Sequence, residues 1–213
     1  MNCYRNLNLP TELLNPNAVD QFEELKKLYI VNGWKNNVTT NVEDFLSEDF
    51  LRVLKDQCRL KPKYFILFGT YPGQKGFLHS DQYYENNQWN SAPCSINWEI
   101  VPTAAVMQWY DPLTPLAEIE PHWNPNEAAP ADQALKRVGV KYYDTAHSKD
   151  SSKFQLVDSL TMDSSPRLFR TDVPHQTVHT NNSTDRISMA IRFELGDIPT
   201  WERALEVFQP ILG

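Results

Sequence analysis

Hydrophobic and polar residues alternate strictly over residues 186–193. The apolar positions are Ile187, Met189, Ile191 and Phe193, and the positions between them are Arg186, Ser188, Ala190 and Arg192. Because successive side chains of a strand point to opposite faces, this pattern predicts a strand with one apolar face and one face that carries two arginines. Arginines on such a strand usually lie in water, so their partners elsewhere in the chain decide what this face does.

Two stretches near the start of the chain have the spacing of amphipathic helices. Residues 17–31 place apolar side chains at helical intervals with charged residues between them, namely Val19, Phe22, Leu25, Leu28 and Tyr29. A second helix is predicted to begin at a cap at Thr40 or Asn41 and to end before Pro62. Its apolar side consists of Phe45, Leu46, Phe50, Val53, Leu54 and Cys58. Both apolar sides need a partner, and we expect it to be the back of a β-sheet.

From residue 64 the pattern changes to short strands separated by turns. The predicted strands are 64–69, 77–81, 95–100, 105–110, 141–143, 154–157 and 167–170, ahead of the alternating strand 186–193. Residues 1–16 read as an extended arm, and a short helix over 201–208 closes the chain. The order favours one mainly β domain over 1–213, with a helical flank (1–62), a core (63–111 and 152–195) and a C-terminal helical segment (196–213).

Residues 112–150 interrupt this core. They contain Pro112, Pro115, Pro121, Pro125 and Pro130 and only one weak strand. Loops of this length in compact domains are usually functional lids or disordered segments. We expect an insertion that acts as a lid, in which Trp123, Tyr142 and Tyr143 close over a substrate; a surface loop remote from the site is the alternative.

Composition excludes several classes of protein. The net charge is −7 and no cluster of basic residues is present, which disfavours a nucleic-acid partner. No apolar run is long enough to cross a membrane, and no apolar segment follows Met1, so we expect neither a membrane span nor a secretory signal. Three widely spaced cysteines, Cys3, Cys58 and Cys94, indicate reduced thiols rather than a disulfide framework, with Cys94 in a packing role. We therefore expect a cytoplasmic protein.

One set of residues could hold a metal ion. His79 and Asp81 are alternate residues of a predicted strand, so they share a face, and His175 lies far downstream after Pro174. Two imidazoles and one carboxylate are the ligands of non-haem Fe(II) sites that keep coordination positions open. His179 has the same strand parity as His175 and is its rival.

The order of these residues resembles a known family. His79-x-Asp81, then the distant His175, then Arg186-x-Ser188 resemble the Fe(II)/2-oxoglutarate-dependent oxygenases of the small hydroxylase type, over roughly residues 64–111 and 154–194. The spacing from His175 to Arg186 matches the family, whereas His179 lies closer. The resemblance implies a double-stranded β-helix (a jelly-roll or cupin-like barrel) with the N-terminal helices on one sheet.

The resemblance also implies the chemistry. Fe(II) would be held by His79, Asp81 and His175, and Arg186 with Ser188 would point inward and bind the distal carboxylate of the cosubstrate 2-oxoglutarate. With O₂, such an enzyme hydroxylates a C–H bond of a small molecule or peptidyl residue and releases succinate and CO₂. Two alternatives are a cupin-type metalloenzyme without a keto acid, and a non-catalytic jelly-roll binding module.

Four further residues are candidates for the surroundings of the site. Arg192 is expected either to contact the site from the second layer of residues or to lie in water at a sheet edge. Tyr64, Asn97 and Trp109 either line the pocket or belong to the core. His122 and His147 fall in the insertion and are expected to be surface histidines.

Overall fold

The computed structural model describes residues 2–10, 12–18, 37–39, 42–70, 78–85, 88–101, 103–113, 138–142, 154–179, 186–194 and 196–213. The predicted helix over 17–31 lies almost entirely outside these residues. Most of the predicted insertion over 112–150, including His122 and His147, lies outside them too.

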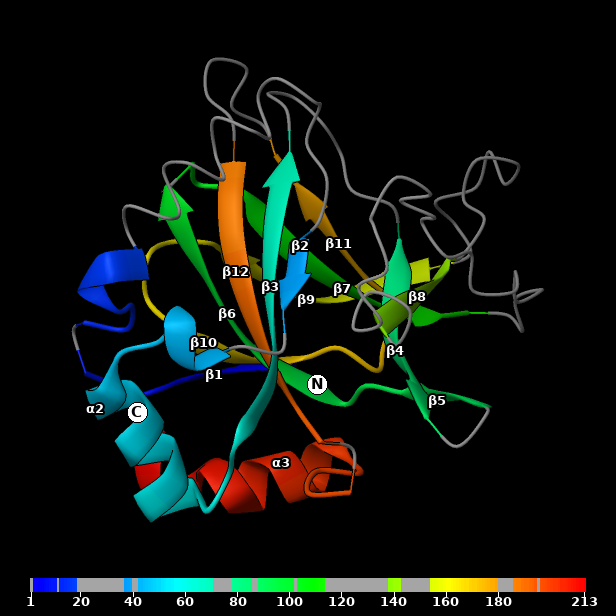
Figure 1. Ribbon diagram of the computed structural model, residues 1–213. Coiled ribbons are helices and arrows are strands. Elements are labelled where there is room, and N and C mark those ends of the chain that lie inside the picture. Colours follow the sequence, from blue (N-terminus) through cyan, green and yellow to red (C-terminus); the bar gives the residue numbers. More distant parts are fainter. Residues whose placement is uncertain are drawn as a thin grey trace.

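The described strands form two antiparallel sheets (Figure 1). The first sheet has the order β1 (Tyr4–Asn6), β10 (Arg167–Arg170), β6 (Cys94–Val101), β12 (Arg186–Phe193), β3 (Pro62–Thr70) and β2 (Asn37–Thr39). The second has the order β5 (Gln88–Ser91), β4 (His79–Glu85), β11 (His175–Val178), β7 (Val106–Pro112) and β9 (Phe154–Thr161), and β8 (Val138–Tyr142) also pairs with β4. The result is a β-rich, jelly-roll-like fold.

The strand predictions are confirmed with shifted ends. The alternating strand corresponds to β12, and the stretch 141–143 belongs to β8, which is longer and begins at Val138. Short strands absent from the predicted set are β1, within the predicted extended arm, and also β2, β5 and β11. These strands have three or four residues each, too few to show a clear alternation.

The helix before β3 is shorter than predicted. Helix α2 (Glu48–Val53) begins at Ser47, whose side-chain oxygen accepts a hydrogen bond from the amide of Phe50. The cap of α2 is therefore Ser47, and the predicted caps Thr40 and Asn41 lie outside the described residues; a separate 3₁₀ turn over Val42–Asp44 precedes Ser47. A π-helical turn over Leu54–Cys58 carries the chain towards β3.

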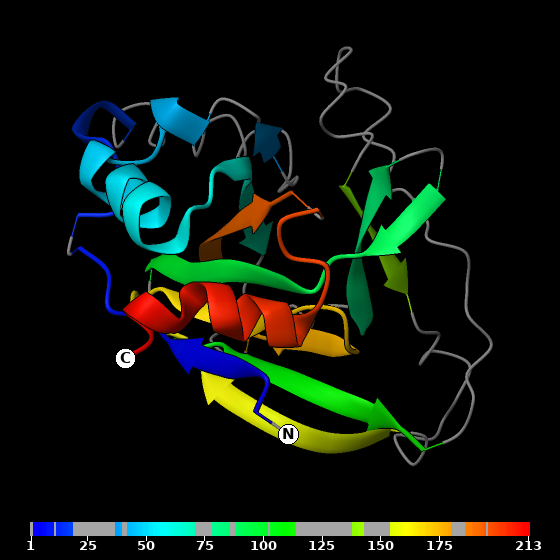
Figure 2. The ribbon, with the colours of Figure 1, turned by 90° about the horizontal axis from the view of Figure 1, so that it is seen from below.

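The main core lies between the helices and the outer face of the first sheet. Helix α3 (Trp201–Phe208) is capped by Thr200, and α2 and α3 both lie against this sheet (Figures 1 and 2). Apolar residues of β12 and both helices share one buried cluster, which includes Ile187, Met189, Ile191, Phe193, Phe50, Leu54, Trp201 and Phe208. The expectation that the apolar face of β12 packs under helices is confirmed.

The other face of β12 points into the space between the sheets. Arg192 of β12 forms an ion pair with Asp81 of β4, which belongs to the second sheet. The two sheets therefore face each other, and the polar face of β12 is interior rather than solvated. In the described part of the chain, no helix has both the length and the apolar composition needed to cross a membrane.

Candidate metal centre

Strand β4 carries the first two candidate ligands. His79 and Asp81 are two residues apart and therefore share one strand face. The backbone around Asp81 is fixed on both sides, since its amide donates to the carbonyl of Thr171 at 2.8 Å and its carbonyl accepts from the amide of Ala92 at 2.9 Å. These hydrogen bonds therefore fix the backbone position from which the carboxylate extends.

The third candidate comes from the neighbouring strand. His175 is the first residue of β11 and lies directly opposite His79 in the antiparallel register. On its other side, β11 pairs with β7, where His175 lies opposite Trp109. This central position in the second sheet is why residues almost a hundred positions apart in sequence meet.

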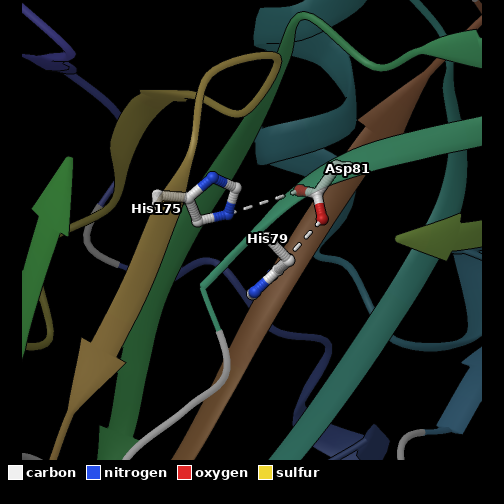
Figure 3. Close-up of side chains that lie close together, drawn as sticks. All are labelled: His79, Asp81 and His175. Carbon is white, nitrogen blue, oxygen red and sulfur yellow. Dashed lines mark ion pairs between the residues drawn. The ribbon is translucent and has the colours of Figure 1, made fainter. Parts of the chain in front are cut away.

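The three side chains converge (Figure 3). Nε2 of His79 lies 3.7 Å from Oδ1 of Asp81, and Nε2 of His175 lies 3.9 Å from Oδ2 of Asp81. One ligand atom from each residue lies within 4.8 Å of the others. Ligand atoms at about 2.1 Å from one ion and at right angles are about 3 Å apart, so small side-chain rotations would let all three reach a common ion.

His175 is in the protonation state that a metal ligand needs. Its Nδ1 lies 2.9 Å from the carbonyl oxygen of Val173, which can only accept, so Nδ1 carries the proton and Nε2 presents its lone pair to Asp81. Burial and the neighbouring His79 lower the pKa of His175 to about 4, so the ring is neutral at neutral pH. The donor set and its tautomer thus fit a divalent transition metal.

Arg192 is a direct neighbour of the site. Its Nη2 donates to Oδ2 of Asp81, and both side chains are buried. Burial alone would raise the pKa of Asp81, but the Arg192 guanidinium and the imidazoles of His175 and His79 outweigh it and hold that pKa below its usual value. Asp81 is therefore an anion ready to bind a cation, and the alternative of a solvated Arg192 is wrong.

Arg186 has a partner that the sequence did not reveal. Its Nε donates to Oε1 of Glu99 at 2.6 Å, and the two side chains are 6% and 0% exposed. Burial lowers the pKa of Arg186, and the Glu99 carboxylate opposes that effect. Ser188 is also buried and lies opposite Glu99 in the pairing of β12 with β6. A hint existed in the alternation of β6, where Ser95, Asn97 and Glu99 are polar, but only the pairing of β6 with β12 brings Glu99 to Arg186.

The remaining candidates divide between the inner face of the first sheet and a core cluster. Tyr64 is buried and lies opposite Arg192 in the pairing of β3 with β12, so it is on the inner face. Asn97 is on the inner face of β6, with a buried Oδ1 that has no hydrogen-bond partner among the described residues. Trp109 belongs to a second core cluster, because it packs on Phe169 and its Nε1 donates to the carbonyl of Arg170.

His179 and the cysteines lie outside the group of three. His179 is buried but follows the end of β11, and among the described residues the cluster able to hold a metal contains His175 instead. All three cysteines are free and buried, and burial raises the pKa of Cys94 to about 12, which agrees with a packing role.

No protein-family model and no curated protein sequence matches this chain. Solved structures to which it is similar include HygX from Streptomyces hygroscopicus with nickel and 2-oxoglutarate bound, at 11% identity and a TM-score of 0.40, over 88% of this chain and 80% of that one. The non-haem α-ketoglutarate-dependent carbocyclase SnoK from nogalamycin biosynthesis is 9% identical with a TM-score of 0.45, over 90% and 80% of the two chains. AviO1 from Streptomyces viridochromogenes Tue57 is 11% identical with a TM-score of 0.41, over 90% and 89%.

Some of these similar structures contain iron or 2-oxoglutarate. HygX has been solved with iron as well as with nickel and 2-oxoglutarate. Because every one of these TM-scores lies below 0.5, the likeness carries no weight for function, and the site geometry has to support any proposal.

Proposed function

We propose that this protein is an Fe(II)- and 2-oxoglutarate-dependent oxygenase that hydroxylates a C–H bond of a small molecule or peptidyl residue and releases succinate and CO₂. The observation that carries the proposal is the convergence of His79, Asp81 and His175, with the His175 tautomer fixed by Val173. Within the proposed double-stranded β-helix, these ligands would lie between the two sheets.

The roles of the residues follow from their contacts. His79, Asp81 and His175 would hold Fe(II) on one face and leave the opposite positions open. When bound, the metal would supply the activation of O₂ and the oxidative decarboxylation of the keto acid. Arg192 holds one oxygen of Asp81, which limits the directions in which that carboxylate can bind an ion.

The charges of the interior agree with a doubly charged cosubstrate. Asp81 with Arg192, and Glu99 with Arg186, form two neutral ion pairs. A divalent ion would add two positive charges, which a dicarboxylate such as 2-oxoglutarate would balance. Arg186 and Ser188 lie on the inner face of β12 and are proposed to bind the distal carboxylate by hydrogen bonds.

One observation favours a second candidate. Because Arg186 already has an internal carboxylate partner, the site could serve a cupin-type metalloenzyme that uses no keto acid. That enzyme would keep the metal ligands and would show no turnover of 2-oxoglutarate.

Metal analysis followed by a product assay separates these candidates. The protein is loaded with Fe(II) without oxygen, its iron content is measured, and succinate is then quantified after 2-oxoglutarate and air are added, with and without candidate substrates. If the protein is an oxygenase, we expect about one iron per chain and succinate formation that depends on iron. Iron without succinate favours the cupin-type enzyme, and no iron contradicts both. A His175→Ala variant, which lacks one proposed ligand, is the matched control.

A further inference from the structure

Glu99 is a fully buried carboxylate in direct contact with the proposed cosubstrate anchor. It contacts Nε of Arg186, at one edge of the guanidinium. Among the described residues, Arg186 forms an ion pair with Glu99. Glu99 contacts Nε and does not occupy the Nη groups, which are the donors that a ligand carboxylate would use.

The surrounding backbone holds Glu99 in this position. Oε2 of Glu99 accepts a hydrogen bond from the amide of Thr103 at 2.9 Å, so each carboxylate oxygen has a defined partner. Ala104 has a φ of 55°, a left-handed conformation that is uncommon outside glycine, in the connection that follows Thr103. The pairing of β6 with β12 shifts between Ile187 and Ser188, beside Glu99. Such shifts often re-aim side chains next to functional sites.

The charge of the anchor affects both the binding of 2-oxoglutarate and the release of succinate in the proposed reaction. 2-Oxoglutarate and succinate carry the same distal carboxylate, so a buried and uncompensated guanidinium would bind the product as well as the cosubstrate. A paired guanidinium still offers directional hydrogen bonds but attracts an anion less strongly.

We propose that Glu99 sets the charge of the cosubstrate anchor, so that Arg186 selects the distal group by hydrogen bonding while succinate is released readily. The inference rests on the proposed function. It makes Glu99 a residue that tunes specificity through Arg186, without contact to the reacting atoms.

Calorimetry on Glu99→Gln tests this inference. Glutamine has the same shape and can still accept from Nε of Arg186, but it removes the negative charge and replaces the acceptor that faces the Thr103 amide with a donor. Binding of 2-oxoglutarate, succinate and 2-oxopentanoate is measured without oxygen on the Fe(II)-loaded protein. Both dicarboxylates are expected to bind at least tenfold more tightly to the variant, which equals about 1.4 kcal/mol. 2-Oxopentanoate, which has no distal carboxylate, should change less than threefold.

The control is Glu206→Gln, which removes an exposed charge on α3 and should leave all three affinities unchanged. Unchanged or weaker binding of the two dicarboxylates to Glu99→Gln overturns the inference, and so does an equal change for all three ligands, since that would indicate a merely structural role.

A ligand comparison on the wild-type protein decides the matter if Glu99→Gln does not fold. 2-Oxoglutaramate carries a neutral amide of the same shape at its distal end, and it should bind within tenfold of 2-oxoglutarate if the anchor is neutralised. A larger loss overturns the inference. If iron-loaded wild type binds none of the ligands, the proposed function fails as well; if it binds 2-oxoglutarate and only the Glu99 results differ, the inference alone fails.

Discussion

At the scale of single residues, the proposed metal site is completed by one of two histidines, His175 or His179. His175 lies opposite His79 in the sheet register and presents Nε2 to Asp81, whereas His179 follows the end of the strand. We predict that His79→Ala, Asp81→Ala and His175→Ala each lose tight Fe(II) binding, while His179→Ala keeps it. Iron titration monitored by metal analysis is the measurement. Loss of iron in the His179 variant together with retention in the His175 variant would show that the assignment is wrong.

Asp81 also has a structural role, which the metal titration alone would miss. Its carboxylate faces the buried guanidinium of Arg192, and removing one partner of a buried ion pair typically costs about 3–5 kcal/mol. We predict this loss of unfolding free energy for Asp81→Ala and a smaller loss for Asp81→Ala combined with Arg192→Met. Denaturant unfolding of the two single variants and the double variant measures it. Additive losses would show that the two residues are not coupled.

The sequence predicted the three side chains that converge in the candidate metal centre, but not the ion pairs around them. His79, Asp81 and His175 could be named because a two-residue spacing on a strand has a geometric meaning, and the spacing to Arg186 supported the choice. Glu99 and the contact of Arg192 could not be named, because they depend on which strands become neighbours. Alternation within one strand says which face a residue takes and does not say what lies opposite.

At the scale of elements, the sequence predicted the long alternating strand and missed short strands that form by pairing with their neighbours. The eight-residue alternation of β12 predicted both its strand and the side on which the helices pack. The three-residue strands β1 and β2 form by pairing with β10 and β3, so their signal lies in their neighbours. The cap of α2 was misplaced because several polar residues precede the helix, and only the hydrogen bond from Phe50 identifies Ser47.

Helix α3 stabilises the sheet that carries Arg186 and Arg192 without touching the metal site. The buried ring of Phe208 packs edge-on against Phe193 of β12, with ring centroids 5.4 Å apart. We predict that Phe208→Ala lowers the unfolding free energy by about 3–5 kcal/mol, because it leaves a cavity in the main core. Val207→Ala, at the adjacent and only partly buried position, should cost less. Denaturant unfolding measures both, and a similar small loss in the two variants would contradict this role of the core.

At the scale of the whole molecule, the segment between β7 and β8 is proposed to act as a lid over the substrate. Strand β8, which follows this segment in the sequence, pairs with β4 beside the proposed ligands, with Val140 opposite Asp81. An exchange of residues 114–137 for a short Gly/Ser linker would leave β8 intact. We predict nearly unchanged Fe(II) and 2-oxoglutarate binding, a sharp fall in substrate hydroxylation and persistent succinate formation, because a lid excludes water from the reaction.

Succinate and hydroxylated product measured in the same reaction test the lid. A variant in which both products still form in equal amounts on the native substrate would show that the segment does not close over the site. The control is an exchange in the exposed turn at Ser164 and Ser165, which lies in the connection between β9 and β10.

One interior site is proposed to bind Fe(II) through His79, Asp81 and His175 and to bind 2-oxoglutarate through Arg186. Calorimetric titration of 2-oxoglutarate without oxygen tests this double role, on wild type with and without Fe(II), on His175→Ala and on Arg186→Met. We predict one-to-one binding to the iron-loaded wild type and at least tenfold weaker binding in each of the other cases, with Arg186→Met still holding iron. Equal affinity in all four samples, or no binding to the iron-loaded wild type, would contradict the account.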